Sequence, residues 1–196
     1  MTEKSAIRAA KIALRRAIGA EDARSAAESA ADHAMTLLQG AGGVHGRTVA
    51  LYMPIQNELD TRPLEGRLRD AGARLALPRV RTDGEPMTFR EWRSDDALHK
   101  GYGGIREPAE DAAELVPDIV VVPLSAFDRR GFRVGYGKGH YDRTLGPLER
   151  GVRPLTLGYA FAVQEVEEVP RELHDVPLDA VVTEVEIIRC NLWNQV

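Results

Sequence analysis

Residues 118–123 read DIVVVP, a β-branched run in which polar and apolar side chains do not alternate. Apolar residues at every position are typical of a strand that is covered on both faces, as in a largely parallel sheet. Helical and strand-like segments interleave on both sides of this run. That arrangement predicts an α/β fold, a three-layer domain with a mostly parallel or mixed sheet.

Hydrophobic periodicity and turn residues give the elements outward from this strand. The cluster Gly40–Gly43 ends a second helix, and Pro63 and Gly72 mark the first turn and the end of a third. We expect helices at 2–18, 20–39, 61–71 and about 140–150, and strands at 47–53, 74–77, 87–92, 154–159, 180–183 and 187–192. Residues 101–104 and 107–114 are interpreted as a surface connection. Because we find no repeat, low-complexity segment or linker, we expect one domain over residues 1–196.

The 196 residues are 43% hydrophobic and 29% charged, which is the balance of an ordinary globular domain. A net charge of −4 gives no general attraction for nucleic acid or anionic membranes, so any anion site must be local. Cys190 is the only cysteine, which excludes an internal disulfide and favours the cytoplasm. The longest apolar run, residues 119–124, is too short to span a membrane, and the N-terminus lacks a signal-peptide pattern. We expect a cytoplasmic monomer that binds small molecules and neither nucleic acid nor membranes.

The most informative segment follows the buried strand and reads GFRVGYGKGHYD, residues 131–142. Open α/β sheets bind ligands beyond the carboxyl ends of their strands. Gly135, Gly137 and Gly139 allow successive backbone N–H groups to converge on an anion, and a following helix adds the positive end of its dipole. Arg133 and Lys138 supply positive charge for phosphate oxygens. The segment therefore favours a phosphate site.

This loop matches neither of the common nucleotide motifs. The P-loop requires Ser or Thr after Gly-Lys, where this chain has Gly139, and the dinucleotide fingerprint requires Gly where it has His140. By spacing alone, a mobile hairpin or turn with incidental basic residues is the competing interpretation.

Several ordered motifs together resemble the 5-formyltetrahydrofolate cyclo-ligase (methenyltetrahydrofolate synthetase) family. The central one is the run 123–128, PLSAFD, followed by Gly131-x-Arg133-x-Gly135-x-Gly137-x-Gly139-x-Tyr141-Asp142. The others are Lys4-x-x-x-Arg8, Tyr52-Met53-Pro54-x-x-x-Glu58, Pro78-Arg79, Gly104-Ile105-x-Glu107-Pro108 and Asp179-Ala180-Val181-Val182. The resemblance extends over nearly the whole chain. It departs from the family at His140, where an aromatic residue, commonly Tyr, is usual.

The resemblance implies both a fold and a reaction. The fold is similar to that of sugar-phosphate isomerases and CoA-transferases. The reaction converts 5-formyltetrahydrofolate and ATP, with Mg²⁺, to 5,10-methenyltetrahydrofolate, ADP and phosphate through a phosphorylated formyl intermediate. Such chemistry requires mainly in-line positioning and cations around the transferred phosphoryl group.

The resemblance also implies the roles of particular residues. The catalytic residues are Lys138 and Arg133. ATP would be bound by Lys4, Arg8, Arg133, Val134, Gly135, Tyr136, Gly137, Lys138, Gly139, His140 and Tyr141. The folate would be bound by Met53, Glu58 and Tyr136, and Mg²⁺ by Asp142 and Asp179. Without the resemblance, Asp142 reads as an acid in the first turn of a helix, Asp179 as a strand-edge cap, Met53 as core and Glu58 as a surface acid.

The first helix carries a basic stripe beside an apolar seam. The stripe consists of Lys4, Arg8, Lys11 and Arg15, and the seam of Ile7, Leu14 and Ile18. A solvated charged face is the commoner meaning of such a stripe. The resemblance overrides it for Lys4 and Arg8 alone, so Lys11 and Arg15 are interpreted as solvent-facing. Trp92 and Cys190 are interpreted as core.

Two further functions stay open at this stage. One is a catalytically inactive relative that binds nucleotide or folate. The other, which rests on fold analogy alone, is a sugar-phosphate isomerase or CoA-transferase-type enzyme that needs no ATP.

Overall fold

The computed structural model describes residues 2–82, 84–145, 153–172 and 175–190. Within these ranges, eight strands form one sheet in the order β12-β11-β10-β7-β1-β2-β3-β6. Their bounds are β12 Ile187–Arg189, β11 Ala180–Val182, β10 Leu155–Tyr159, β7 Ile119–Val122, β1 Thr48–Ala50, β2 Arg74–Arg79, β3 Thr88–Glu91 and β6 Glu114–Leu115. The five central strands, β11 to β2, are parallel, and the strands at both edges are antiparallel. The predicted mostly parallel, mixed sheet is confirmed.

The helices are α1 (Glu3–Arg16), α2 (Ala20–Gly40), α3 (Arg62–Asp70) and the short α4 (His140–Leu145). The Thr2 hydroxyl caps α1 by accepting a hydrogen bond from the Ser5 amide at 3.3 Å. Pro63 lies in the first turn of α3, where its missing N–H costs nothing. These local signals explain why the first three helices were predicted correctly. The expected end of α4 near Arg150 and the strand end near Leu192 lie outside the described residues.

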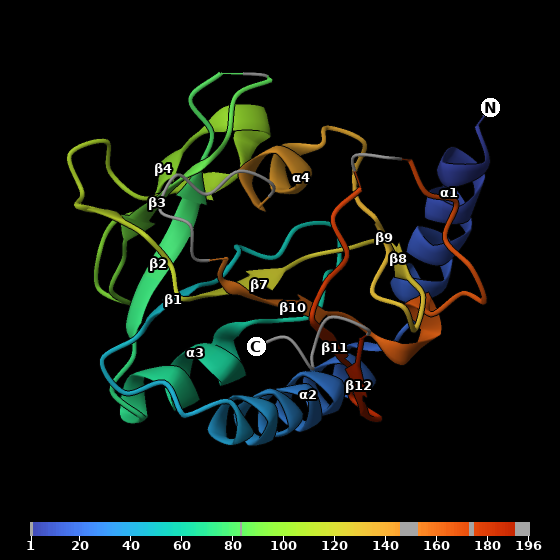
Figure 1. Cartoon of the computed structure of the whole chain (residues 1–196), viewed down its shortest axis with the longest axis horizontal. Coiled ribbons are helices and arrows are strands. Elements are labelled where there is room, and N and C mark those ends of the chain that lie inside the picture. The colour runs from blue at the N-terminus through green and yellow to red at the C-terminus, as the bar shows by residue number, and fades with distance from the viewer. Residues whose placement is uncertain (1, 83, 146–152, 173–174, 191–196) are drawn as a thin grey trace.

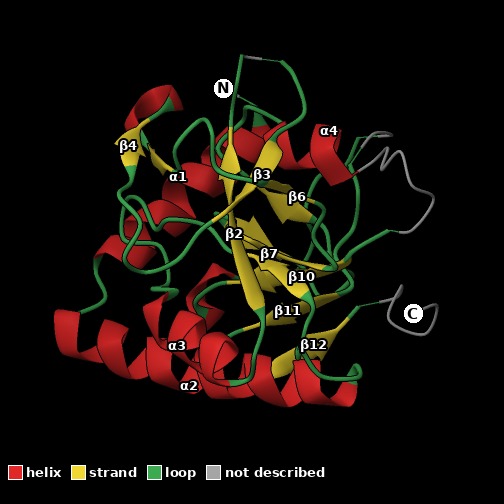
Figure 2. Cartoon of the chain, turned by 90° about the vertical axis from the view of Figure 1, so that its left-hand side faces the viewer, coloured by secondary structure: helices red, strands yellow, loops and turns green. Residues whose placement is uncertain are grey.

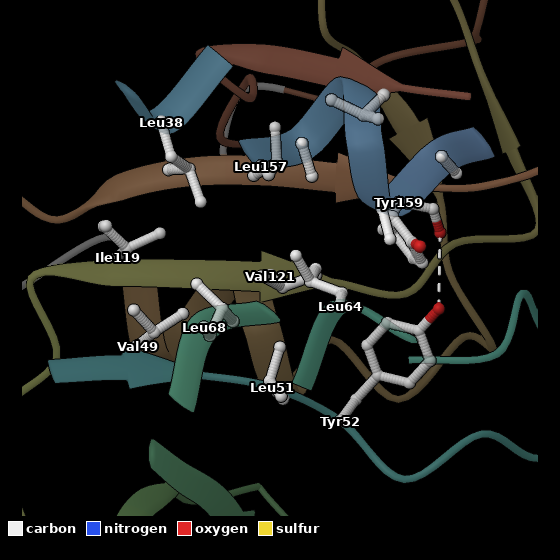
Figure 3. Close-up of a cluster of buried hydrophobic side chains, with 14 of the residues drawn as sticks. Leu38, Val49, Leu51, Tyr52, Leu64, Leu68, Ile119, Val121, Leu157 and Tyr159 are labelled. Carbon is white, nitrogen blue, oxygen red and sulfur yellow. Dashed lines mark hydrogen bonds between the residues drawn. The ribbon is translucent and has the colours of Figure 1, made fainter. Parts of the chain in front are cut away.

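Two hydrophobic clusters fill the two faces of the sheet. On one face, Val49, Val121 and Leu157 point toward α2 and α3 (Figure 3). On the other face, Val120 and Val122 pack in a cluster that includes Leu145 of α4. Figure 2 shows α2 and α3 as one layer below the sheet. Among the described residues, the opposite layer contains α4 and irregular segments. No helix within the described ranges is long and apolar enough to cross a membrane.

Strand order places a topological switch point between β1 and β7. These neighbours are parallel, but the chain leaves β1 toward β2 on one side and leaves β7 toward β10 on the other (Figure 1). Connections diverging from adjacent strands open a crevice beyond the carboxyl ends of the strands. The turn 51–60 follows β1. The hairpin β8 (Ala126–Phe127) and β9 (Arg133–Val134) follows β7 and leads into the glycine-rich loop.

The stretch interpreted as a surface connection contains more structure than expected. It includes the hairpin β4 (His99–Lys100) and β5 (Arg106–Glu107), with the 3-10 turn Tyr102–Gly104 between them, and it reaches β6. Glu107 is buried and accepts hydrogen bonds from the amides of Val80 and Tyr102, both at 3.3 Å. The backbone of Gly101 passes so close to this carboxylate that a Cβ there would overlap it. Such short elements lack the periodicity that reveals longer ones.

Candidate active site

The glycine-rich loop, residues 135–139, connects β9 to α4. Gly137 and Gly139 have φ of +89° and +64°, a region that L side chains rarely adopt. Gly135 has no positive φ, so the backbone at this position does not require the conformational freedom of glycine that we expected there. At Gly137, an added Cβ would lie 3.3 Å from Nη2 of Arg8. The loop therefore lies close to the first helix.

The basic stripe of α1 faces the protein. Arg8 Nε donates to the Gly135 carbonyl at 2.6 Å, and Lys4 Nζ donates to Asp175 Oδ2 at 2.7 Å. Lys11 Nζ donates to the carbonyl oxygens of Val163 and Glu165 at 2.9 and 2.6 Å. The structure thus brings Arg8 to the loop, as the site prediction requires. Lys4 lies beside an acidic partner.

Arg15 was interpreted as solvent-facing, and that interpretation is wrong. Its side chain is fully buried, while Leu14 of the expected apolar seam is 47% exposed. Arg15 Nη2 donates to the Tyr136 hydroxyl at 2.7 Å and to the Gln56 carbonyl at 2.9 Å. The basic side of the helix faces the protein because backbone carbonyls and an acidic side chain of other segments accept hydrogen bonds from it. The only sequence signal for this was the continuation of the stripe from Arg8 at helical spacing.

Arg133 and Asp142 form a short ion pair. Nη2 of Arg133 lies 2.6 Å from Oδ1 of Asp142, and Nη1 donates to the Val176 carbonyl at 2.6 Å. Burial lowers the pKa of the guanidinium, and the nearby carboxylate of Asp142 opposes that effect. Both terminal nitrogens of Arg133 are therefore engaged, and the bond to Asp142 holds the first turn of α4. Asp142 retains partial exposure, at 27% of its side chain.

The remaining loop residues differ in exposure. Lys138 is exposed, Val134 is buried in β9, and Tyr136 is half-buried. Burial raises the pKa of Tyr136 to about 12, and it also raises the pKa of Tyr141. The ring of His140 meets the ring of Tyr102 edge-on, with centroids 5.5 Å apart. Lys138 is the only Lys or Arg within residues 135–139, and its side chain is exposed.

Glu58 lies in a tight turn after β1. Gln56 and Asn57 have φ of +49° and +61°, a conformation that costs about 1–3 kcal/mol per non-glycine residue. Glu58 is only 8% exposed; Oε2 accepts from the Ile55 amide at 2.9 Å, and Oε1 has no hydrogen-bond partner among the described residues. Burial raises the pKa of Glu58 to about 7, although the Ile55 amide, the Tyr136 hydroxyl and Arg15 each lower it. A buried carboxylate with one unpartnered oxygen is a candidate for ligand recognition.

A cavity of about 510 Å³ opens beside this turn. Its lining includes Met53, Pro54, Glu58, Thr61, Arg62 and Trp92. The volume lies within the usual range for small-molecule sites, and the lining combines apolar walls with a few polar groups. Trp92 is buried, as expected, yet it also contributes to the cavity wall, and the Arg69 guanidinium lies 5.2 Å above its ring.

Asp179, predicted as a magnesium ligand, has a different setting. It is fully buried before β11, where Oδ1 accepts from Arg153 at 2.6 Å and Oδ2 accepts from the Thr156 amide and hydroxyl, both at 2.7 Å. Thr156 lies near the amino end of β10, whereas the switch-point crevice lies beyond the carboxyl ends. In this arrangement neither carboxylate oxygen is open to a metal. The local geometry is that of the strand-edge cap that we considered as the alternative.

The fold and the site together define an α/β protein with a cationic, glycine-rich loop next to a cavity that holds a buried carboxylate. The loop and the turn that carries Glu58 both follow strands of the switch point, β7 and β1, and Arg15 donates to both of them. The chain belongs to the 5-formyltetrahydrofolate cyclo-ligase family, whose sequence model matches residues 1–184.

Individual relatives agree with this membership. The chain is 36% identical over 174 residues to 5-formyltetrahydrofolate cyclo-ligase of Escherichia coli strain K12, which covers 86% of this chain and 93% of the relative. It is 33% identical over 150 residues to the protein of the same name from Mycolicibacterium smegmatis, covering 71% and 75%. The NMR structure of Aquifex aeolicus 5,10-methenyltetrahydrofolate synthetase has a TM-score of 0.80 and 30% identity, covering 97% of this chain and 94% of that one. A 5,10-methenyltetrahydrofolate synthetase from Mycoplasma pneumoniae, at TM-score 0.75 and 23% identity, shares the fold over 93% and 99% of the two chains.

Proposed function

We propose that this chain is an ATP-dependent ligase that cyclises 5-formyltetrahydrofolate to 5,10-methenyltetrahydrofolate and releases ADP and phosphate. The observation that carries the proposal is that the glycine-rich loop and the turn that carries Glu58 are joined through Arg15, which donates to the Tyr136 hydroxyl and to the Gln56 carbonyl, in a chain of the cyclo-ligase family. A reaction between a nucleotide and a second small molecule requires two adjacent subsites, and this junction supplies them.

The chemistry proceeds in two balanced steps. The formyl oxygen attacks the γ-phosphorus of ATP, the bond to the β,γ-bridging oxygen breaks, and ADP leaves. N10 of the folate then attacks the formyl carbon and loses its proton, and the C–O bond breaks so that the oxygen departs with the phosphoryl group as inorganic phosphate. Phosphorylation converts a poor leaving group into a good one, so the protein mainly has to position both reactants and stabilise charge.

The loop is the proposed triphosphate site. Backbone amides of residues 135–139 and the exposed Lys138 would surround the phosphates, with Lys138 stabilising the transferred group. Arg8 holds the loop from below through the Gly135 carbonyl, and Lys4 lies on the same helix face. Arg133 has both terminal nitrogens engaged by Val176 and Asp142. We therefore propose that Arg133 shapes the loop. Lys138 is the stronger candidate for direct contact with phosphate.

The cavity beside the turn 53–58 is the proposed pterin site. Oε1 of Glu58 has no hydrogen-bond partner in the part of the chain that the structure describes, so it can accept from the N–H groups at the donor edge of a pterin. Met53 lines the same cavity with an adaptable apolar side chain. Tyr136 is the loop residue directed toward the turn, because its hydroxyl and the Gln56 carbonyl accept hydrogen bonds from the same Arg15 nitrogen.

Magnesium is part of the proposal as the ion that accompanies ATP. No group of three or more His, Cys, Asp or Glu side chains that could hold a metal occurs among the described residues. That suits Mg²⁺, which commonly uses one or two carboxylates together with phosphate oxygens and water. Asp142, partly exposed in the first turn after the loop, fits this role, and Asp179 does not. When bound, the ion would neutralise charge on the transferred phosphoryl group.

A direct assay tests the function. Purified protein is mixed with 5-formyltetrahydrofolate, ATP and Mg²⁺, and the near-ultraviolet absorbance of the methenyl product is followed, with omission of ATP as the control. ATP-dependent product formation supports the proposal. Binding of both ligands without turnover would instead make the chain an inactive relative, and absence of any ATP binding would exclude the function. A cytoplasmic location, a monomeric state and one domain over residues 1–196 remain part of this proposal.

A further inference from the structure

Arg15 occupies an unusual position at the switch point. Its side chain is only 1% exposed, and its guanidinium donates to three different segments. Nη2 donates to the Gln56 carbonyl at 2.9 Å and to the Tyr136 hydroxyl at 2.7 Å, and Nη1 approaches the Leu124 carbonyl at 3.4 Å. These acceptors belong to the turn after β1, the glycine-rich loop and the segment that follows β7. One side chain therefore joins the turn that carries Glu58 to the glycine-rich loop.

The Arg15 guanidinium is held by neutral acceptors. A buried guanidinium loses hydration, which costs several kcal/mol unless a well-placed carboxylate compensates. Among the described residues, no carboxylate oxygen forms a salt bridge with Arg15 within 4.0 Å, and its Nε has no hydrogen-bond partner. Its burial is instead compensated by the carbonyl and hydroxyl oxygens of the turn and the loop, which ties the placement of these two segments to Arg15.

The segment held by Arg15 is also strained. Gln56, whose carbonyl accepts from Arg15, and Asn57 have positive φ, and Glu58 follows directly. On the loop side, the Tyr136 hydroxyl is fixed by the same Nη2 atom that binds Gln56. A displacement of the loop at Tyr136 is thus transmitted through one nitrogen to the turn that carries Glu58.

We infer that Arg15 is a positioning residue that couples the nucleotide and folate subsites, so that occupation of either one raises the affinity of the other. This inference rests on the proposed function, because it takes the loop and the cavity as the two subsites. By linkage, the factor by which ATP tightens folate binding must equal the factor by which folate tightens ATP binding. Couplings of this kind are typically about 5–150-fold.

The test measures binding only, without turnover. Dissociation constants of a non-hydrolysable ATP analogue and of 5-formyltetrahydrofolate are determined by calorimetry, each alone and each at saturation with the other. The variants are Arg15→Met, which keeps the aliphatic stem, and Tyr136→Phe, which removes one acceptor and leaves the buried charge. Arg16→Met, the same change at the exposed neighbouring position, is the matched control.

We expect the wild type and Arg16→Met to show the same coupling factor, and Arg15→Met to reduce it nearly to one. The two separate affinities in Arg15→Met should change by less than about threefold. Tyr136→Phe should also lower the coupling, and the double variant should lose no more than Arg15→Met alone, because both changes break the same connection. If Arg15→Met does not fold, Tyr136→Phe and Arg15→Lys decide the question.

Two outcomes overturn the inference. One is a wild-type coupling factor of one while both ligands bind, which leaves the proposed function untouched. The other is full coupling in Tyr136→Phe together with full coupling in any folded Arg15 variant. Failure of the wild type to bind either ligand would instead contradict the proposed function itself, so the two failures are distinguishable.

Discussion

Arg8 and Gly135 are joined by a hydrogen bond of 2.6 Å from the guanidinium Nε to the backbone carbonyl, across 127 positions of sequence. The bond fixes the first glycine of the loop to helix α1. Two residues later, Gly137 passes the same guanidinium so closely that a Cβ would lie 3.3 Å from Nη2. Helix α1 thereby packs against the loop at Gly135 and Gly137, whereas Lys138 is exposed to solvent.

That arrangement predicts a large effect of Lys138→Ala on turnover. Removal of a single donor that stabilises developing charge in the transition state costs about 10²–10³ in kcat. We therefore expect kcat to fall by about that factor. The measurement is initial rate against ATP concentration. Arg24→Ala, which removes an exposed positive charge from α2, is the control and should retain wild-type kcat. Wild-type kcat in Lys138→Ala would remove this residue from the mechanism.

Glu58 predicts a pH dependence of stability. Its pKa is raised from 4.5 to about 7 in the folded protein, mainly by burial. The folded state therefore binds more protons than the unfolded state between these values, so stability falls as pH rises through this window. The shift corresponds to about 3 kcal/mol, fully expressed above pH 7. The neighbouring tyrosines titrate above this window, since burial raises the pKa values of Tyr52, Tyr136 and Tyr141.

The experiment compares wild type with Glu58→Gln by urea denaturation from pH 4.5 to 8.5. The glutamine variant should gain up to about 3 kcal/mol relative to wild type as the pH rises, because an amide does not ionise. Glu167→Gln, at an exposed position, should run parallel to wild type throughout. Parallel curves for Glu58→Gln and wild type would show that the carboxyl is not held protonated by its surroundings.

Gly101 and Gly66 predict opposite effects of the same substitution. A Cβ at Gly101 would overlap the buried carboxylate of Glu107, so Gly101→Ala should cost about 1–3 kcal/mol as the β4–β5 hairpin shifts. Gly66 lies in the exposed interior of α3 with nothing within 4 Å of an added methyl group, so Gly66→Ala should add about 0.5–1 kcal/mol. Thermal and urea unfolding of both variants provide the check. A neutral Gly101→Ala would mean that the hairpin is not held by Glu107.

Features carried by local sequence could be predicted, whereas those set by tertiary contacts could not. The buried run 119–122 and the helices follow from residue patterns that the chain carries locally. Arg15 was misjudged because periodicity defines stripes on a helix without saying which one meets the protein. In this case the basic stripe finds carbonyl acceptors, and Leu14 is left exposed. Glu107 is buried inside a polar, glycine-rich stretch without helical or strand periodicity, so its place in the Gly104-Ile105-x-Glu107-Pro108 motif gave no sign of its burial.

The setting of Asp179 is also decided by tertiary contacts that the sequence does not reveal, and its proposed structural role can be tested. Its partner Thr156 lies 23 positions earlier and reaches it only through the parallel pairing of β10 with β11. Asp179→Asn should therefore lower the free energy of unfolding by about 1.5–3 kcal/mol, the worth of a hydrogen bond to a charged group. It should leave the Mg²⁺ concentration for half-maximal turnover unchanged. Asp142→Asn should raise that concentration at least about tenfold, a common effect of weakening a metal site. The opposite pattern is an Asp179→Asn variant of unchanged stability that needs a higher Mg²⁺ concentration for half-maximal turnover. That result would mean that the metal replaces Arg153 as the partner of Asp179.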